Sequence, residues 1–115
     1  MSHVDDLLVM APVKRAVLDE ASLAGYTVST IVAAVPGKRI RVLAMAFSTS
    51  STNAGALQSD GVDIAVMRPG PAVPIVWSLM PTGWCDTTES EALGYHNDGA
   101  SAAAVWATIL YQEVD

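Results

Sequence analysis

Residues 26–47 read YTVSTIVAAVPGKRIRVLAMAF, two runs of alternating β-branched and apolar residues with a Pro-Gly pair between them. Such alternation is typical of β-strands. Pro36 presets φ at the first central position of a tight turn, and Gly37 accepts the positive φ that a type II turn requires next. The segment therefore predicts an antiparallel hairpin with strands at 26–33 and 39–47.

The second of these strands carries its charges at one end. Arg39 and Arg41 have the same parity as Leu43, Met45 and Phe47. Because strand side chains alternate between the two faces, these five residues are expected on one face. That face should be solvated at its start and covered at its end.

Outward from this segment, further short runs have a period of two and are separated by turn residues. Together they favour an all-β sandwich or barrel of one antiparallel domain. Pro74 marks an edge or an irregular entry to its strand, because proline cannot donate to a ladder. The last run is apolar on both faces, which indicates a central strand or one covered by a neighbour. The expected strands are 13–18, 56–59, 62–67, 73–80, 93–97 and 105–114, with a loop at 48–55.

The segment 12–24 has a second interpretation. Pro12 near its start and Gly25 just after its end also suit a helix. We favour the strand at 13–18 followed by a loop to Gly25.

The composition bounds the classes of protein to consider. A chain of 115 residues is one domain, and 51% hydrophobic with 16% charged residues is a globular composition. The single cysteine, Cys85, allows no internal disulfide and fits a chain made in a reducing cytosol. The charge-free apolar stretch 69–85 contains four prolines and so predicts no membrane helix. The N-terminus has no basic region ahead of its apolar run, so we expect no secretory signal.

The charge balance disfavours nucleic acid as a partner. Twelve acidic against six basic residues give a net charge of −6. Nucleic-acid binding depends on clustered Lys and Arg that release counterions. Here the bases gather only at 14–15 and 38–41, with Arg68 elsewhere. We expect those clusters to be solvated strand ends or contacts to an acidic protein surface.

Residues 1–12 form a separate unit from the sandwich at 13–115. They place Leu7, Leu8, Val9 and Met10 beside a chain end. Chain ends fray unless they are tied down. The apolar run is therefore either one more strand of its own sheet or an arm that docks on a neighbouring subunit by edge pairing.

Candidate catalytic and metal-binding groups are few. Cys85, His96 and Asp98 can be written as nucleophile, base and orienter, but nothing nearby in the sequence would lower the pKa of the thiol. The simpler interpretation makes Cys85 a small apolar residue and His96 a turn residue. His96-x-Asp98, like the histidine and aspartates at 3–6, offers too few ligands for a structural zinc site. We therefore expect no catalytic residues, no metal and no cofactor.

An ordered set of short segments covers most of residues 13–114. It consists of VPGKRIRVL at 35–43, PTGW at 81–84, a threonine at 87 or 88, EAL at 91–93 and YQEV at 111–114. In this order and spacing the chain resembles the head cement (decoration) proteins of tailed bacteriophages. Residues 1–12 match no segment of those proteins, and Cys85 stands where an apolar or aromatic residue is usual.

The resemblance implies a jelly-roll sandwich without enzymatic activity. Such a protein binds the outer surface of the phage head as a dimer or trimer and bridges neighbouring major capsid protein subunits. It is made in the host cytoplasm and ends on the virion. On this basis we expect two contact surfaces: Leu7, Leu8 and Met10 in the arm, and Lys38, Arg39 and Arg41 at the turn.

Two further expectations concern the aromatic residues. We expect Trp84 to anchor the core together with Val42 and Ile109. Trp77 and Trp106 are either core residues or hot spots of an interface, and we favour the core because their area dominates packing among small residues. The alternative function is a tail- or fibre-associated sandwich that binds host-surface glycans. That function would need exposed aromatic residues on a loop face, such as Tyr95 and Trp84.

Overall fold

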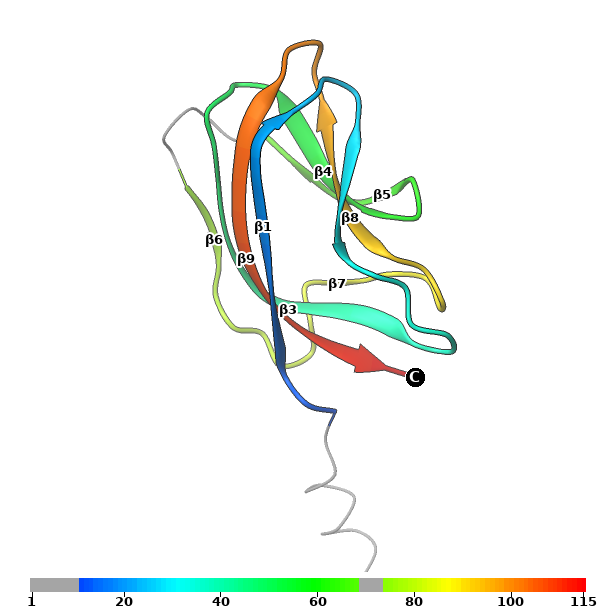
Figure 1. Ribbon diagram of the computed structural model, residues 1–115. Helices are drawn as coiled ribbons and strands as arrows, with labels where there is room; N and C mark the ends of the chain where they lie inside the picture. Colours follow the sequence, from blue (N-terminus) through cyan, green and yellow to red (C-terminus); the bar gives the residue numbers. More distant parts are fainter. Residues whose placement is uncertain (1–10, 69–73) are drawn as a thin grey trace, which may run out of the picture.

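The computed structural model describes residues 11–68 and 74–115, and throughout this part the regular structure is β-strand (Figure 1). It contains no helix long and apolar enough to cross a bilayer. The segment at 12–24 is a strand, as we favoured, although it runs to Leu23 rather than ending near Leu18. The strands are β1 (Lys14–Leu23), β2 (Val28–Val32), β3 (Arg39–Thr49), β4 (Ala54–Ser59), β5 (Val62–Met67), β6 (Ile75–Trp77), β7 (Cys85–Asp86), β8 (Leu93–Asp98) and β9 (Ala103–Val114).

The strands form two antiparallel sheets packed face to face. Sheet A has the order β1-β9-β3-β6, with the short β7 also pairing with β3, and sheet B has the order β2-β8-β4-β5. Successive strands pass repeatedly from one sheet to the other, and the last strand, β9, lies between β1 and β3. This is the jelly-roll arrangement of a β-sandwich, and it confirms the predicted fold class.

The predicted hairpin is wrong, although its turn is right. The Lys38 amide donates to the Val35 carbonyl at 3.0 Å, and Gly37 has a φ of 75°. The strands on either side of this turn nevertheless lie in different sheets, since β2 pairs with β8 and β3 pairs with β9. The turn sets only the local direction of the chain. The partner strands, β8 of β2 and β9 of β3, lie more than 50 residues away in the sequence.

The predicted face of β3 is also wrong, because a bulge interrupts its alternation. Ile40 and Val42 point inward, so Arg41 is directed away from the core. Between Val42 and Ala44 the register with β9 shifts by one residue. Beyond the shift Met45 and Phe47 are buried instead of sharing a face with the arginines. A bulge adds one unpaired residue to a strand and reverses which side chains face the core.

The core lies between the inner faces of the two sheets. Val42 and Ile109 are fully buried there, as predicted. Tyr95 also belongs to it, at 2% exposure, with its ring centroid 5.0 Å from that of Phe47. The other large buried residues include Leu18, Ile40, Met45, Leu57, Leu93 and Val105.

The tryptophans do not form the core. Trp84 is 42% exposed, with its ring stacked on Trp77 at a centroid distance of 5.3 Å and its indole nitrogen donating to the Ser78 carbonyl at 2.8 Å. Trp106 is 46% exposed, and Trp77 is half-buried. Our expectation for Trp84 and Trp106 is wrong. The alternation of β9 turns Val105 and Ala107 inward and Trp106 outward, and Trp84 packs on Trp77 instead of entering the core.

Candidate functional site

The N-terminal segment enters the sandwich at a fixed point. The Ala11 carbonyl accepts a hydrogen bond of 2.8 Å from the Gln112 side-chain amide. Gln112 is buried in β9, so the root of the arm is tied to the last strand just before β1 begins at Lys14. The predicted contact residues Leu7, Leu8 and Met10 lie outside the described residues.

The basic turn reaches the same end of the molecule. Arg39 opposes Val114 in the pairing of β3 with β9, and Lys38 forms an ion pair with Asp115. In Figure 1 the start of β1 and the C-terminus lie together at this end. We call it the arm corner. It surrounds a hollow of about 540 Å³ lined by Ala11, Pro12, Lys14, Lys38, Glu113, Val114 and Asp115.

Most of the positive charge at the arm corner is already paired. The Lys14 ammonium lies 3.1 Å from the Glu113 carboxylate. The Lys38 ammonium hydrogen-bonds Asp115 and thereby lowers the pKa of that carboxyl. Arg39 is exposed and forms no ion pair with any residue in the described part of the chain. Among the described residues of this corner, Arg39 is therefore the cation left for a partner.

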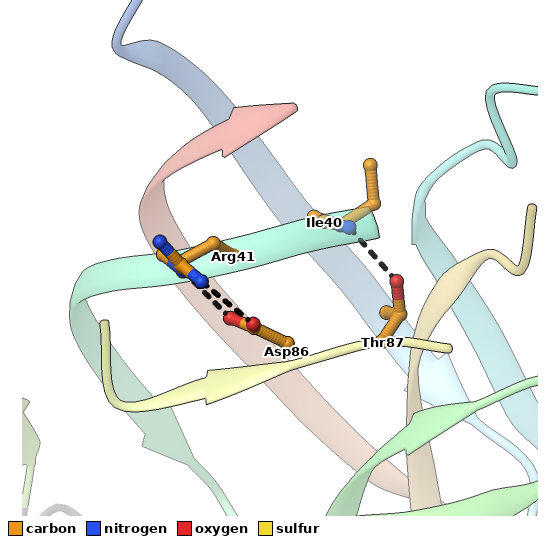
Figure 2. Close-up of polar contacts among 4 residues, drawn as sticks. All are labelled: Ile40, Arg41, Asp86 and Thr87. Carbon is orange, nitrogen blue, oxygen red and sulfur yellow. Dashed lines mark hydrogen bonds and ion pairs between the residues drawn. The ribbon is translucent and has the colours of Figure 1, made fainter. Parts of the chain in front are cut away.

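Arg41 has an internal partner (Figure 2). Its Nε and Nη2 donate to the two carboxylate oxygens of Asp86 at 2.9 and 3.0 Å. This hydrogen bond raises the pKa of Arg41, and the pair holds β7 against β3. Next to it the Ile40 amide donates to the Thr87 hydroxyl at 2.8 Å. A contact between Arg41 and another protein remains a prediction. The Nε and Nη2 groups of its guanidinium are already hydrogen-bonded to Asp86.

The residues considered for catalysis are divided between the sheets. Cys85 pairs with Val42 in sheet A, whereas His96 pairs with Val28 and Ala56 in sheet B. Burial, with a smaller contribution from Asp86, raises the pKa of the Cys85 thiol to about 11. The thiol is therefore protonated at neutral pH, and the nucleophilic form of cysteine is the thiolate. Within residues 11–68 and 74–115 there is no cluster of three or more metal-ligating side chains.

A second candidate surface is the outward side of sheet A. The pairing register places Val17, Thr108, Ala46 and Val76 side by side in one row across β1, β9, β3 and β6. Val17 is 60% exposed and Val76 is 68% exposed. Trp106 and Leu110 lie on the same side of the sheet as Thr108, because each is two residues from it along β9. We call this surface the outer apolar face.

The sequence contained a signal for this face. The run at 105–114 is apolar on both sides, which we took as a sign of a central or covered strand. The strand is central, since β9 lies between β1 and β3. Its second apolar side, which includes the exposed Trp106, is nevertheless turned to the surface.

Comparisons with known protein families, with curated protein sequences and with solved structures find no match to this chain. The arm corner and the outer apolar face are therefore the two surfaces from which a function is inferred.

Proposed function

We propose that this chain is a capsid cement (decoration) protein of a tailed bacteriophage. It binds the outer surface of the head as a homo-oligomer and stabilises the contacts between major capsid protein subunits. The ordered segments described above support this proposal by resemblance. The jelly-roll fold is compatible with it, because this fold occurs in viral capsid proteins, although a fold alone does not assign a function.

The observation that carries the proposal is the convergence at the arm corner. Ala11, at the root of the arm, and the basic turn at 38–41 are far apart in the sequence, and both contact the end of β9. An extended segment can bind a neighbouring protein by adding to a sheet edge and inserting alternate side chains. Leu7, Leu8 and Met10 would supply apolar side chains, and Arg39 a charge for an acidic patch on the capsid protein.

An oligomer would make such contacts effective even where each is weak. Linking binding sites on one rigid body can raise the overall affinity by about 10²–10⁴ without new contacts. The extensive pairing of β3 with β9 and of β1 with β9 gives the chain a stiff framework for this purpose. The function is therefore static and depends on shape and on the number of copies bound.

The test is binding to emptied, expanded heads of the phage that encodes the chain. We expect the full chain to sediment with the heads in a saturable manner, and the chain lacking residues 1–11 to lose most of this binding. Arg39→Ala should weaken binding, whereas Arg68→Ala, which removes an exposed arginine beyond the end of β5, should leave it unchanged. Absence of binding by the full chain, or undiminished binding without residues 1–11, would contradict the proposal.

A glycan-binding module is the second candidate, and one observation favours it. The exposed indole of Trp84, stacked on Trp77, is a platform on which a sugar ring can lie. The other expected aromatic residue, Tyr95, is buried in the core, so that part of the expectation is wrong. A glycan-array signal that is lost in Trp84→Ala and kept in the chain lacking residues 1–11 would favour this function over the first.

A further inference from the structure

The outer apolar face carries its charges at one edge, in a symmetric arrangement. Arg15 and Asp19 flank Val17 at equal distances along β1, and all three side chains are exposed. Across the sheet, Arg15 opposes Leu110 and Asp19 opposes Trp106. The central row from Val17 to Val76 thus has one cation on one side and one anion on the other.

This arrangement makes the face complementary to itself. A two-fold axis lying in the face along the row of Val17, Thr108, Ala46 and Val76 brings each of these residues over its own copy. The same rotation places Arg15 over Asp19 of the second copy, and Asp19 over Arg15. A two-fold interface requires that two residues contact each other reciprocally, and here both reciprocal contacts join opposite charges.

The shape of the face follows the same symmetry. The bulky, exposed Trp106 lies on one side of the row, and Leu110 lies on the other. The two-fold rotation therefore places Trp106 of one copy over Leu110 of the other copy. On that side Leu110, Ala44, Ala46 and Val76 line a hollow of about 300 Å³. Small residues at 44 and 46 therefore leave space where the partner's tryptophan would lie.

We infer that the outer apolar face of sheet A binds a second copy of this chain about that two-fold axis. This dimer would be the homo-oligomer of the proposed function, and its biological role rests on that function. The geometry of the face does not depend on the proposed function. Sheets packed face to face keep their strands within about 30° of alignment, and this rotation sets each strand antiparallel to its own copy.

The size of the face sets the strength expected of the pair. Four strands at about 4.8 Å and five residues at about 3.3 Å give a projected area of roughly 300 Å². Specific interfaces commonly bury about 800 Å² of accessible surface per partner. We therefore expect a weak dimer, whose average mass in solution rises with protein concentration.

A charge exchange tests the pairing by sedimentation equilibrium. We expect the wild-type chain to shift with concentration from 12.0 kDa toward twice that mass. Arg15→Asp and Asp19→Arg should each raise the dissociation constant about tenfold or more, because each sets like charges opposite one another twice. An equimolar mixture of these two variants should dimerise again, since both contacts then join opposite charges.

A matched pair of valine substitutions controls for effects on folding. Val17→Asp puts two carboxylates against each other on the axis and should give a monomer. Val66→Asp makes the same change at a 67% exposed valine of β5 in sheet B and should leave the dimer intact. Circular dichroism and thermal melts establish that both variants are folded.

The remaining outcomes separate the pairing from the proposed function. A wild-type chain that stays at 12.0 kDa into the millimolar range, or a variant mixture that stays monomeric, would overturn the inference. A monomer that still saturates phage heads would overturn the pairing and the homo-oligomer, but not the role as a head-binding protein. A dimer with the expected charge dependence that never binds heads would overturn only the proposed function.

Discussion

The hydroxyl of Thr87 satisfies a buried backbone amide of β3. Its oxygen accepts the Ile40 amide at 2.8 Å, and both residues are buried. Thr87→Val keeps the shape of the side chain but leaves this N–H buried without a partner. We expect the free energy of unfolding to fall by about 1–3 kcal/mol, measured by urea denaturation.

The control for this prediction is Thr30→Val. Thr30 is an exposed threonine of β2, and surface substitutions usually change stability by less than about 0.5 kcal/mol. An equal loss of stability in both variants would show that the hydroxyl of Thr87 has no special role.

Cys85 gives the stability a dependence on alkaline pH. Burial raises the pKa of its thiol to about 11 in the folded chain, whereas an unfolded cysteine has a pKa of about 8.5. The folded state therefore keeps a proton that the unfolded state loses, so this contribution is complete below about pH 8.5 and is lost as the pH rises toward 11. Tyr95, whose pKa burial raises to about 12, acts in the same direction at higher pH.

The comparison that isolates the thiol is Cys85→Ala. In urea denaturation under reducing conditions, we expect the free energy of unfolding to fall less steeply between pH 8 and 10.5 in the variant than in the wild type. Parallel pH profiles for the two chains would contradict this account.

At the scale of elements, β4 and β8 are fitted to one another at a glycine. A Cβ on Gly55 would coincide with the ring and hydroxyl of Tyr95. Gly55→Ala must displace this buried ring, and we expect a loss of about 1–3 kcal/mol of stability, typical of overpacking. In a double-mutant cycle Tyr95→Phe should recover part of the loss, because it removes the atom nearest to the new methyl group. Strictly additive losses would contradict the predicted contact.

The sequence predicts the strands better than it predicts their partners. Period-two alternation located most of them, and the Pro36-Gly37 turn forms as expected. The predicted hairpin was wrong because a local turn does not determine which distant strands pair with the two strands that flank it. The predicted face of β3 was wrong for a related reason. A run of apolar residues does not indicate where a bulge, here at Leu43, shifts the register.

The candidate surfaces were predictable only in part, for the same physical reason. The arm and the basic turn stand out in the sequence by composition. The meeting of Ala11 with the basic turn at the arm corner depends on the non-local pairing of β1 and β3 with β9. The acidic partners of Lys14, Lys38 and Arg41 likewise come from segments 45 or more residues away. Sequence position alone therefore overestimated the positive charge available to a partner.

At the scale of the whole molecule, the two candidate surfaces predict cooperation between pairing and head binding. A dimer presents two arm corners, so breaking it with Val17→Asp should lower the apparent affinity for expanded heads by about 10²–10⁴. Titration of the variant and of Val66→Asp onto the same heads measures this loss. Equal affinity of the two variants would show that binding is monovalent.

Copy number on the particle tests the central claim most directly, because a protein that reinforces the shell must bind at many equivalent positions. Quantitative mass spectrometry of purified virions gives the ratio of this chain to the major capsid protein. We expect on the order of hundreds of copies per particle in a fixed ratio, as the symmetry of an icosahedral shell requires. Roughly a dozen copies or fewer would place the chain on the tail and would contradict a role as capsid cement.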